Sequence, residues 1–476
     1  MPLIESRKVY LLCSRRPIVG EFVLLAGEMV STSDLTPVFV VAEGLKESLI
    51  AQIPADTEVI ATGAQSWRNA GRIAFGAYLL FAVLRRLGAA LRTLRLELFA
   101  DFIATWEALA RGRVFAKHVL RLDSDNCIAI LTADDRDIRF DQGMLRAARD
   151  RKIFSMSVAF GKSDPDTDAM RRTNREYAVD SGPWSFLKLR IARDYPANVR
   201  ATSSGNRVFF LKPAEYLALR AHDVLFPVPW SYGGGTADKV SLIDKDGQVM
   251  LRSLGVPASK VMVAGQCSHD ILWLLRERRD AIRKTLDIEH DLDPARPLLV
   301  LALPVLGEHG MASMEQQIED TSLLFQAMVK VAGKNVLVSL HPRQKPADYM
   351  ALANCHGVKL TALPLRDVLP AADLFVAYSS TINWAQLLCI PSVALEYFNL
   401  GYALFANQPG VLIASSRDML ADVCATAINP GDTRSACLAA LASFSTEMHF
   451  DGQVRRRIIN EIKSHSQKGP VCVSSV

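Results

Sequence analysis

The chain has 476 residues, of which half are hydrophobic and 22% are charged, with 27 Gly and 22 Pro spread along it. This length predicts two domains, or three, and the composition excludes a disordered chain, a collagen-like repeat and a disulfide-stabilised miniprotein. The net charge of +5 is unevenly distributed, because residues 68–121 hold ten Lys or Arg against three acids. That basic segment carries +7, and the rest of the chain is at −2.

The eight cysteines indicate a reducing compartment. They show no paired spacing, and most lie in apolar runs, as reduced core thiols do. The first residues place Glu5 ahead of a short apolar run, unlike a secretory signal. The longest apolar run, 73–84, has 12 residues, against about 20 for a membrane span. We therefore expect a cytoplasmic protein, associated at most with the inner face of the cytoplasmic membrane.

Strand-like apolar runs alternate with helical patterns in both halves of the chain, which indicates parallel, doubly wound sheets. The first half has predicted strands at 8–13, 38–41, 58–61, 127–131 and 153–158 and helices at 21–30, 45–53 and 144–149. The second half has predicted strands at 239–243, 261–264, 298–303, 336–340, 374–377 and 392–395 and helices at 315–331 and 382–388.

The segment between these two series, 160–235, is rich in Asp, Arg, Ser, Pro and Gly and predicts a loop-rich junction. We therefore expect an α/β protein with two Rossmann-like domains, 1–235 and 236–463, that face an interdomain cleft, the natural ligand site of such a pair. Residues 464–476 predict a disordered tail.

The sequence VLVSLHPR, at 336–343, ends a buried strand in His341, Pro342 and Arg343. At the carboxyl end of a parallel strand, these side chains are expected at the ligand crevice, with Lys345 as a further donor. Clustered cationic donors suit a phosphate or a sugar nucleotide. A His–Pro turn without a ligand is the alternative.

The sequence LFVAYSSTINWAQLL, at 374–388, leads from a strand directly to Ser379, Ser380 and Thr381 and then to a helix. Hydroxyls at a helix N-terminus add to its free backbone N–H groups and favour an anion, although an ordinary N-cap is the alternative. Two strand ends that are compatible with phosphate, one βα unit apart, favour the ligand site.

Residues 237–270 resemble the opening of the C-terminal domain of GT-B glycosyltransferases and UDP-N-acetylglucosamine 2-epimerases, through the pattern aD-strand-helix-x-GV-x-x-x-K-V-x-V-x-G-x-x-x-x-D. With LHPR and DLFVAYSSTINWAQLLCIPSVALEY, the chain is most similar to transferases that use cytidine-nucleotide donors. These are the CDP-glycerol glycerophosphotransferases of teichoic acid synthesis and the bacterial sialyl- and Kdo-transferases. The resemblance covers about residues 237–400.

In those families the His-Pro and Ser-Ser pairs meet the nucleotide, which implies this role for His341, Pro342, Ser379 and Ser380. The 2-epimerases carry S-G-G-x-x-E-E where this chain has SSTINWA, which argues against an epimerase. The glycerophosphotransferases usually show a His-Gly motif in the N-terminal half, and the corresponding place here, 159–161, has no His.

Carboxylates after three other strands are further candidates. Asp134 and Asp135 follow the strand 127–131, where one of them would take the acceptor proton in an inverting transferase. Bacterial sialyltransferases use an Asp/Glu pair in this half, and a solvated acidic loop is the alternative. Glu308 and His309, between two glycines, are candidates for contacts to base, ribose or donor sugar, or form a plain turn. Glu396 follows the strand 392–395, where GT-B enzymes often bind ribose or sugar hydroxyls.

Other classes of site lack support in the sequence. No His, Cys, Asp and Glu set has the spacing of a metal site, and we expect neither a metal nor a cofactor. There is no Walker A loop, no G-x-G-x-x-G and no G-x-S-x-G. Nucleic-acid motifs are also lacking, so nucleic acid is not an expected partner.

The basic segment contains six leucines on one helical arc, with Arg85, Arg86, Arg92 and Arg95 outside it; the leucines are Leu80, Leu84, Leu87, Leu91, Leu94 and Leu98. Three interpretations stay open. The leucines pack on the protein's own sheet, they enter a membrane surface whose anionic lipids meet the arginines, or they bind a partner helix. Peripheral membrane contact would then involve residues 73–100.

Together these patterns predict a metal-independent GT-B glycosyltransferase of surface polysaccharide synthesis, such as capsule or lipopolysaccharide. Domain 1–235 is expected to bind a glycan or lipid-linked acceptor, and domain 236–463 a nucleotide donor, CMP- or CDP-activated rather than UDP-linked. A 2-epimerase-like isomerase or hydrolase and a non-catalytic GT-B partner subunit are the alternatives, and a homodimer is left open.

Overall fold

The computed structural model describes residues 7–14, 16–45, 47–122, 126–158, 160–161, 164–202, 204–308, 311–378, 380–398, 405–448 and 450–467. The chain divides into two compact units, and each is described by itself. The first contains the chain up to Cys267 and again from Val454, and the second runs from Ser268 to Gln453.

A parallel sheet of seven strands forms the centre of the first unit, in the order β3-β2-β1-β4-β5-β8-β9. The strands are β1 (Arg7–Cys13), β2 (Leu35–Val41), β3 (Glu58–Ala61), β4 (Cys127–Thr132), β5 (Phe154–Ser157), β8 (Lys239–Leu242) and β9 (Val261–Val263). The order reverses between β1 and β4, which is where open α/β sheets place their ligand crevice.

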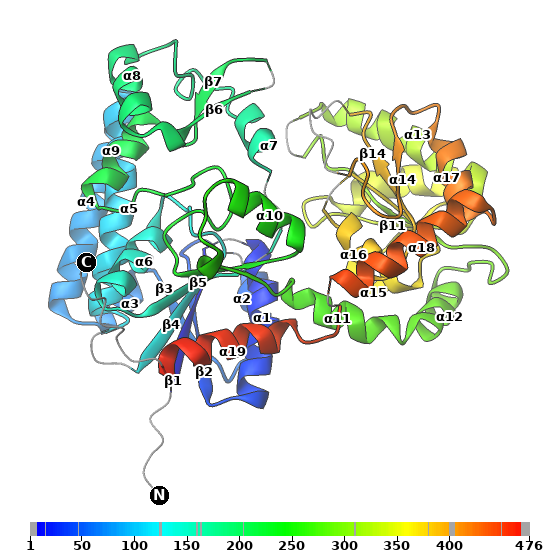
Figure 1. Cartoon of the computed structure of the whole chain (residues 1–476), viewed down its shortest axis with the longest axis horizontal. Helices are drawn as coiled ribbons and strands as arrows, with labels where there is room; N and C mark the ends of the chain where they lie inside the picture. Colours follow the sequence, from blue (N-terminus) through cyan, green and yellow to red (C-terminus); the bar gives the residue numbers. More distant parts are fainter. Residues whose placement is uncertain are drawn as a thin grey trace, which may run out of the picture. The chain divides into compact units, whose positions relative to one another are not determined.

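Helices cover both faces of this sheet because alternate strand residues are apolar on each side. Val9 and Leu11 pack toward α1 (Arg16–Thr32) and α19 (Val454–Gln467), whereas Tyr10 and Leu12 pack toward the helices of the other face. These are α3 (Ala64–Asn69), α4 (Arg72–Thr93), α5 (Glu97–His118) and α6 (Phe140–Asp150). The last helix of the chain, drawn red, lies beside the first, drawn blue (Figure 1). The short helix α2 (Glu47–Ile50) and the helix α10 (Lys245–Ser253) complete this part.

The segment between β5 and β8 forms a small cluster of its own. It contains α7 (Pro165–Met170), α8 (Ser185–Asp194), α9 (Pro213–Ala221) and a hairpin of β6 (Val199–Ala201) and β7 (Arg207–Phe209). Phe209, Tyr216 and Phe226 are buried in its core. The predicted loop-rich junction is therefore a folded insertion with short elements, packed on α5 through Leu109.

The second unit is also a parallel sheet, in the order β12-β11-β10-β13-β14-β15, and the reversal falls between β10 and β13. Its strands are β10 (Leu299–Ala302), β11 (Val336–Ser339), β12 (Lys359–Thr361), β13 (Leu374–Ala377), β14 (Ser392–Leu395) and β15 (Val411–Ala414). Its helices are α11 (Cys267–Arg276), α12 (Arg279–Glu289), α13 (Met314–Ala332), α14 (Pro346–His356), α15 (Leu365–Val368), α16 (Ile382–Leu387), α17 (Leu420–Ile428) and α18 (Asp432–Glu447).

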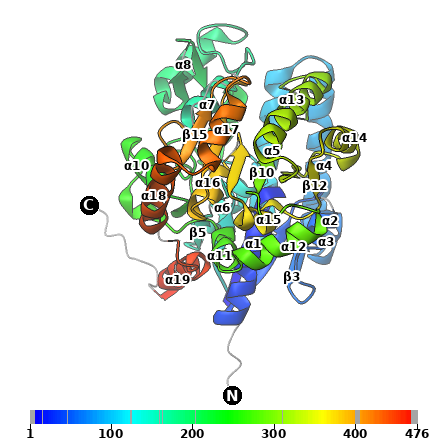
Figure 2. The same cartoon turned by 90° about the vertical axis from the view of Figure 1, so that its right-hand side faces the viewer.

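Two apolar cores lie on the two faces of this second sheet. Leu301 and Val376 point toward the core that contains α13, α14 and α17, and Val300 and Phe375 point toward the core that contains α12, α15 and α16. Helices α13, α17 and α18 of this unit can be followed in Figure 2. Both units therefore have the strand order and the two covered faces of a Rossmann-like fold.

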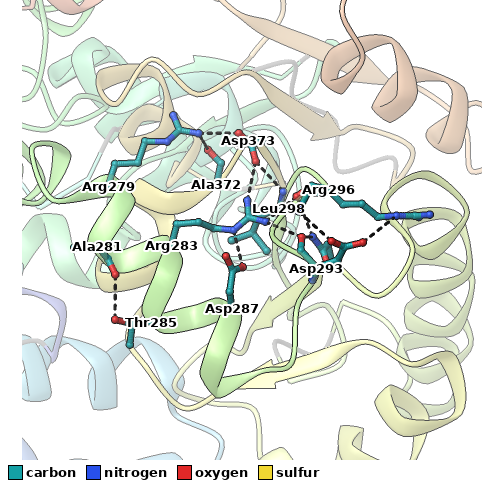
Figure 3. Close-up of polar contacts among 12 residues, drawn as sticks. Arg279, Ala281, Arg283, Thr285, Asp287, Asp293, Arg296, Leu298, Ala372 and Asp373 are labelled. Carbon is teal, nitrogen blue, oxygen red and sulfur yellow. Dashed lines mark hydrogen bonds and ion pairs between the residues drawn. The ribbon is translucent and has the colours of Figure 1, made fainter.

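An ion-pair network joins α12 to the amino ends of the strands of this sheet. Asp373, directly before β13, accepts hydrogen bonds from Arg279 (2.7 Å), Arg283 (3.1 Å) and the backbone N–H of Leu298 (2.8 Å). Figure 3 shows the two arginines reaching from α12 to this carboxylate. Since this network lies before the strands begin, it is structural and distant from the carboxyl ends, where the ligand crevice is expected.

The division of the chain differs from the predicted boundary after residue 235. Strand β8 pairs with β5, and β9 pairs with β8, so the first sheet continues to Val263 and the first unit to Cys267. The unit is closed by α19, in which Ile458 and Ile462 are buried against α1 and the sheet. Residues 464–467, predicted to be disordered, are the last turn of this helix, and 468–476 lie outside the described residues.

The basic segment forms the antiparallel pair α4 and α5, and its leucines differ in their surroundings: Leu84 packs against the core of the first sheet, and three others are exposed. Side chains of Leu80, Leu87 and Leu94 are 59%, 46% and 68% exposed. The inner side of α4 instead buries Ala74 and Phe81 and turns Arg85 and Arg92 toward Glu107 and Asp101 of α5. The interpretation in which this helix packs on the protein's own sheet is therefore confirmed for Phe81 and Leu84, whereas Leu80, Leu87 and Leu94 are left open to solvent.

Candidate functional site

The candidate nucleotide site of the second unit lies at the carboxyl ends of four neighbouring strands, β11, β10, β13 and β14. His341 and Arg343 follow β11, Glu308 follows β10, Ser380 and Thr381 follow β13, and Glu396 follows β14. Neighbouring strands are about 4.8 Å apart, so the outer two of these four are separated by about 14 Å. The sheet thus brings residues from four separate segments of the sequence to one edge.

Two glutamine side chains fix the loop that follows β10. Gln317 of α13 accepts hydrogen bonds from the N–H groups of Leu306 (3.0 Å) and Gly307 (3.2 Å), and donates to the carbonyl oxygen of Pro304 (2.7 Å). Gln344 donates to the same carbonyl (2.9 Å) and accepts from the N–H of His341 (2.9 Å). Gln344 therefore ties the His–Pro turn to the loop at the switch point.

The cationic groups of the His–Pro turn face solvent. His341 and Arg343 are exposed, and the His341 Nδ1 accepts a hydrogen bond from the N–H of Arg343 at 3.2 Å. A neutral His341 therefore carries its proton on Nε2, which makes Nε2 a donor. Among the described residues, the Arg343 guanidinium and the Lys345 ammonium have no hydrogen bond or ion pair. This turn presents cationic donors that a ligand can use.

Glu308 is held beside this turn. Tyr349 of α14 donates a 2.5 Å hydrogen bond to Glu308 Oε1 and lies 3.3 Å from Gln344 Nε2. The other carboxylate oxygen, Oε2, is buried without a hydrogen-bond partner among the described residues. Glu308 is thus a fixed acceptor next to His341, and His309 lies outside the described residues.

The hydroxyl cluster after β13 is only partly described, since Ser379 lies outside the described residues. Ser380 is exposed, and the carbonyl oxygens of Ser380 and Thr381 accept from the N–H groups of Asn383 and Trp384. The following helix, α16, has only six residues, so its dipole is weaker than the sequence pattern suggests. The contribution of this segment to an anion site therefore comes mainly from its hydroxyl groups.

Glu396 lies at the far side of the same edge. Its N–H donates to the carbonyl of Ala414 in β15, and its Oε1 is buried without a partner among the described residues. Burial raises the pKa of Glu396, and a hydrogen bond from the backbone of Phe405 partly opposes this rise. Glu396 therefore offers a hydrogen-bond acceptor to a polar ligand such as a ribose or sugar hydroxyl.

Asp134 and Asp135, in the first unit, have their oxygens engaged within the protein. Asp134 forms two hydrogen bonds with the Arg136 side chain (3.0 and 3.1 Å). Asp135 is fully buried, 3.1 Å from Lys260 Nζ, and also accepts from the N–H of Gly233. Burial raises the pKa of Asp135, against the effect of Lys260. A catalytic role of either stays a prediction, and these contacts assign both a structural role.

The Gly233–Gly235 triplet explains the burial of Asp135. A Cβ on Gly235 would lie 1.8 Å from the Asp135 carbonyl oxygen, so only glycine allows this approach. Gly233 has φ of +86° and places its N–H on the Asp135 carboxylate. The triplet is therefore a packing feature, as its lack of a strand–turn–helix context in the sequence indicates.

A cavity of about 840 Å³ lies within the first unit, beside these aspartates. It is bordered by the carboxyl ends of β1, β2 and β4, by α5, and by the insertion between β5 and β8. The residues that carry its chemistry are Asp137, Asp141, Arg111, Arg139, Arg172, Tyr177 and Glu215. Burial raises the pKa of Glu215 to about 7. Among the described residues, no group of three or more His, Cys, Asp or Glu could hold a metal ion.

No protein-family model and no curated protein matches this sequence, but its fold is similar to that of solved structures. UDP-GlcNAc 2-epimerase from Neisseria meningitidis, bound to UDP-GlcNAc, is 11% identical, with 96% of this chain and 100% of that chain covered and a TM-score of 0.50. UGT2 of Phytolacca americana, with UDP-2fluoro-glucose and pterostilbene, is 13% identical, with coverages of 97% and 99% and a TM-score of 0.52. S. aureus MnaA, in a structure with UDP, is 12% identical, with 97% of this chain and 97% of that chain covered and a TM-score of 0.52.

These similarities define the class of fold. The chain has the GT-B fold, which glycosyltransferases and UDP-GlcNAc 2-epimerases share. The predicted α/β class, the two Rossmann-like units and the resemblance at the level of the fold are confirmed.

Sequence reasoning missed the residues that support the two sites. Gln317, Gln344 and Tyr349 lie on helices or in a turn, and single polar residues in a helical pattern give no signal of their partners. Arg172 and Glu215 lie in the insertion that the sequence predicts as loops. Gln344 alone had a signal, because it is one residue beyond the HPR motif.

Proposed function

We propose that the protein is a glycosyltransferase that moves a sugar, or a sugar-acid or polyol-phosphate unit, from a nucleotide donor to a surface polysaccharide or lipid-linked glycan. The donor is CMP- or CDP-activated, and catalysis needs no metal ion. The observation that carries the proposal is the carboxyl edge of the second sheet. There the His341 imidazole, the Ser380 hydroxyl and Arg343, which has no side-chain partner among the described residues, face solvent at the ends of β11 and β13, on either side of β10.

The chemistry of this edge suits a nucleotide. Arg343, Lys345 and the His341 Nε2–H are cationic or polar donors for phosphate oxygens, and Glu396 is an acceptor for ribose or sugar hydroxyls. Three solved structures of the same fold hold UDP or a UDP-sugar, which supports a nucleotide ligand. The preference for a cytidine nucleotide rests on the motifs around LHPR and YSST.

The proposed reaction is a displacement at the anomeric carbon for a sugar donor. The acceptor hydroxyl oxygen forms a bond to this carbon, the bond from the carbon to the phosphate oxygen breaks, and its electron pair stays on the nucleotide phosphate. His341, Arg343 and Ser380 stabilise that developing charge. The hydroxyl proton passes to a carboxylate of the first unit, for which Asp134 and Asp135 are the sequence candidates and Asp137, Asp141 and Glu215 line the cavity.

We also propose that the first unit contacts the membrane, which fits a lipid-linked acceptor and a cytoplasmic location at the inner face. Helix α4 is long and apolar enough to cross a membrane, with a mean hydropathy of 1.5 and only 17% of its apolar stretch buried. Its ion pairs to Glu107 and Asp101 hold it along α5, so we propose that it lies on the membrane surface. Exposed Phe99 packs edge-on against exposed Trp184 and extends the apolar face to α8.

Nucleotide titration tests the proposed donor site. CMP, CDP, UMP and UDP are each added to the full chain, and the shift in melting temperature is measured. We expect a shift with the cytidine series. Arg343→Gln is expected to lower the affinity for the nucleotide by about tenfold to a hundredfold, because a charge-assisted hydrogen bond is lost. The matched control is Arg296→Gln, an exposed arginine that precedes the first strand of the same sheet.

Turnover measurements separate the enzyme classes. His341→Ala is expected to lower transfer about a hundredfold with folding intact, and activity is expected to persist in EDTA. A UDP-sugar converted without any acceptor would instead assign an isomerase or hydrolase. If none of the four nucleotides changes the melting temperature, both enzyme functions are wrong, and a non-catalytic GT-B subunit is the remaining alternative.

A further inference from the structure

The cavity of the first unit has the position of a ligand site. It lies at the carboxyl ends of β1, β2 and β4, through Ser14, Glu43 and Asp137. The order of the sheet reverses between β1 and β4, and open α/β sheets bind their ligands at this point. The described residues that border the cavity all belong to the first unit. With a volume of about 840 Å³, it is large enough for a sugar-sized molecule.

Arg172 brings a positive charge to this cavity, and the carboxylates of Asp168 and Glu215 act on it only through space. Its guanidinium carbon lies 4.4 Å from the ring centroid of Phe210 and 4.9 Å from that of Trp230. Among the described residues it forms no ion pair, whereas neighbouring Arg136 pairs with Asp134 and Asp168. Burial lowers the pKa of Arg172, as expected for a desolvated cation. An arginine stays charged even so, and a bound anion would neutralise this charge.

The guanidinium of Arg172 is held in place and still has donors for a ligand. Its Nε donates to the carbonyl of Phe210 and its Nη1 to the carbonyl of Asp168. Of its five N–H groups, both on Nη2 and the second on Nη1 therefore have no partner among the described residues. Because two rings and two carbonyls fix the plane, an anion can bind with little further loss of side-chain entropy.

The rest of the cavity combines a second cation with groups that suit hydroxyls. The exposed guanidinium of Arg139 also borders it and has no partner among the described residues. Asp141 accepts from Ser14 (2.6 Å), and the Tyr177 ring lies beside Arg172. A mixture of donors, acceptors and ring faces fits a polyhydroxylated molecule.

We propose that this cavity binds an acceptor sugar that carries a carboxylate or phosphate group, and that Arg172 receives this group through paired N–H bonds. The proposal rests on the proposed function, since it takes the ligand to be the acceptor. It adds the chemical class of that acceptor, an anionic sugar, and the residue that selects it.

Calorimetric titration of the full chain tests the proposal with three probes. Glucuronate carries a carboxylate, glucose 6-phosphate carries a phosphate, and methyl glucoside is neutral. We expect at least one anionic probe to bind at least about tenfold more tightly than methyl glucoside, because the charge-assisted contacts to Arg172 are added. The comparison of glucuronate with glucose 6-phosphate distinguishes the two anionic groups.

Matched variants locate the binding. Arg172→Gln is expected to weaken the binding of the anionic probe at least about tenfold. The control is Arg207→Gln, which removes an exposed arginine of β7 that pairs with Asp180; it is expected to leave this binding unchanged. If Arg172→Gln fails to fold, Arg139→Gln, at an exposed position, and hydrogen exchange of residues 168–178 in the wild type provide the second measurement. Equal binding of methyl glucoside, no effect of the variants, or no protection of 168–178 would overturn the proposal.

The nucleotide site provides an independent reference. Arg343→Gln is expected to weaken the binding of the nucleotide and to leave the binding of the anionic sugar unchanged. Arg172→Gln is expected to weaken the binding of the anionic sugar and to leave that of the nucleotide unchanged. If nucleotides bind and neither anionic probe does, the anionic-acceptor proposal alone is wrong. If an anionic probe binds through Arg172 and no nucleotide binds, the proposed function is wrong and the cavity is a sugar-acid or sugar-phosphate site of another kind. If Arg343→Gln weakens the sugar probe equally, the anion is bound in the second unit, and the proposal for the cavity fails.

Discussion

Glu215 makes the stability of the first unit depend on pH. Burial raises its pKa from 4.5 to about 7, so the folded state binds a proton that the unfolded state releases between these values. Stability is therefore fully present below about pH 4.5 and is lost as the pH rises to about 7, by at most about 3 kcal/mol. Glu215→Gln removes this loss, and we expect the variant to melt higher than the wild type at pH 8 and at a similar temperature at pH 5.

The control for this prediction is Glu97→Gln, which changes an exposed carboxylate at the start of α5. It is expected to be neutral at both pH values, as surface substitutions usually are. Gln at position 215 can still accept the hydrogen bond from the N–H of Lys212, which Glu215 accepts at 2.8 Å. A variant that is less stable than the wild type at pH 8 would contradict a raised pKa.

At the residue scale, the sequence predicts the position of residues at strand ends well, and it predicts the burial and the partners of charged residues poorly. His341 and Arg343 could be placed at the edge because a parallel strand and its following proline determine where they emerge. The state of Asp135 depends on Lys260 and Gly235, which are more than 90 residues away in sequence. No local pattern encodes that approach, so an acidic pair after a strand looks the same whether it is buried or open.

At the scale of secondary-structure elements, Asp373 holds a helix against the sheet of the second unit. Its carboxylate joins Arg279 and Arg283 of α12 to the amino ends of β10 and β13. Asp373→Ala leaves two arginines and the N–H of Leu298 without this acceptor, and we expect the second unit to lose about 2–3 kcal/mol. Differential scanning calorimetry measures the loss. Nucleotide affinity of the folded variant is expected to be unchanged, because the network lies at the opposite end of the strands from His341 and Arg343.

Lys334→Ala is the matched control for this network. It removes an exposed ion pair with Asp291 in the same unit, and such pairs contribute about 0–1 kcal/mol. A melting temperature for Asp373→Ala equal to that of Lys334→Ala would show that the network is not structural. A lower nucleotide affinity would place Asp373 in the site.

Elements follow from the sequence where an apolar run is long enough to be buried. The predicted strands 374–377 and 392–395 match β13 and β14, and both are fully buried. Strand β12, with three residues, and strand β15, whose first three residues are only partly buried, lie at the two edges of the second sheet and were not predicted. An edge strand has one neighbour and less burial, so its apolar signal is weak.

At the scale of the whole molecule, the division of the chain is set by strand pairing and not by composition. The loop-rich segment 160–235 looks like a linker, but β8 and β9 return to the first sheet and α19 covers it. The units are therefore formed by discontinuous parts of the chain. Pairing over these separations has no local signal, and a change in composition marked an insertion within a unit instead of its end.

The exposed face of α4 also belongs to the scale of the whole molecule, because it offers a surface to a membrane. The stripe of Ile73, Leu80, Val83 and Leu87 is 46–79% exposed, and exposed Arg86 and Arg95 flank it, a pattern that complements anionic lipid. We expect the protein to float with liposomes that contain phosphatidylglycerol and not with neutral ones. The double variant Leu80→Ser and Leu87→Ser is expected to lose most of this binding, because about 0.8 kcal/mol per buried CH₂ is removed.

Val249→Ser is the matched control, since Val249 is 66% exposed on α10, away from the stripe. It is expected to bind liposomes like the wild type, and all three proteins are expected to melt at similar temperatures because the changed residues are exposed. Binding that ignores phosphatidylglycerol would remove the electrostatic part of the proposal. A dimer in solution that the Leu80 and Leu87 changes dissociate, without liposome binding by the wild type, would assign the face to a second copy of the chain instead of the membrane.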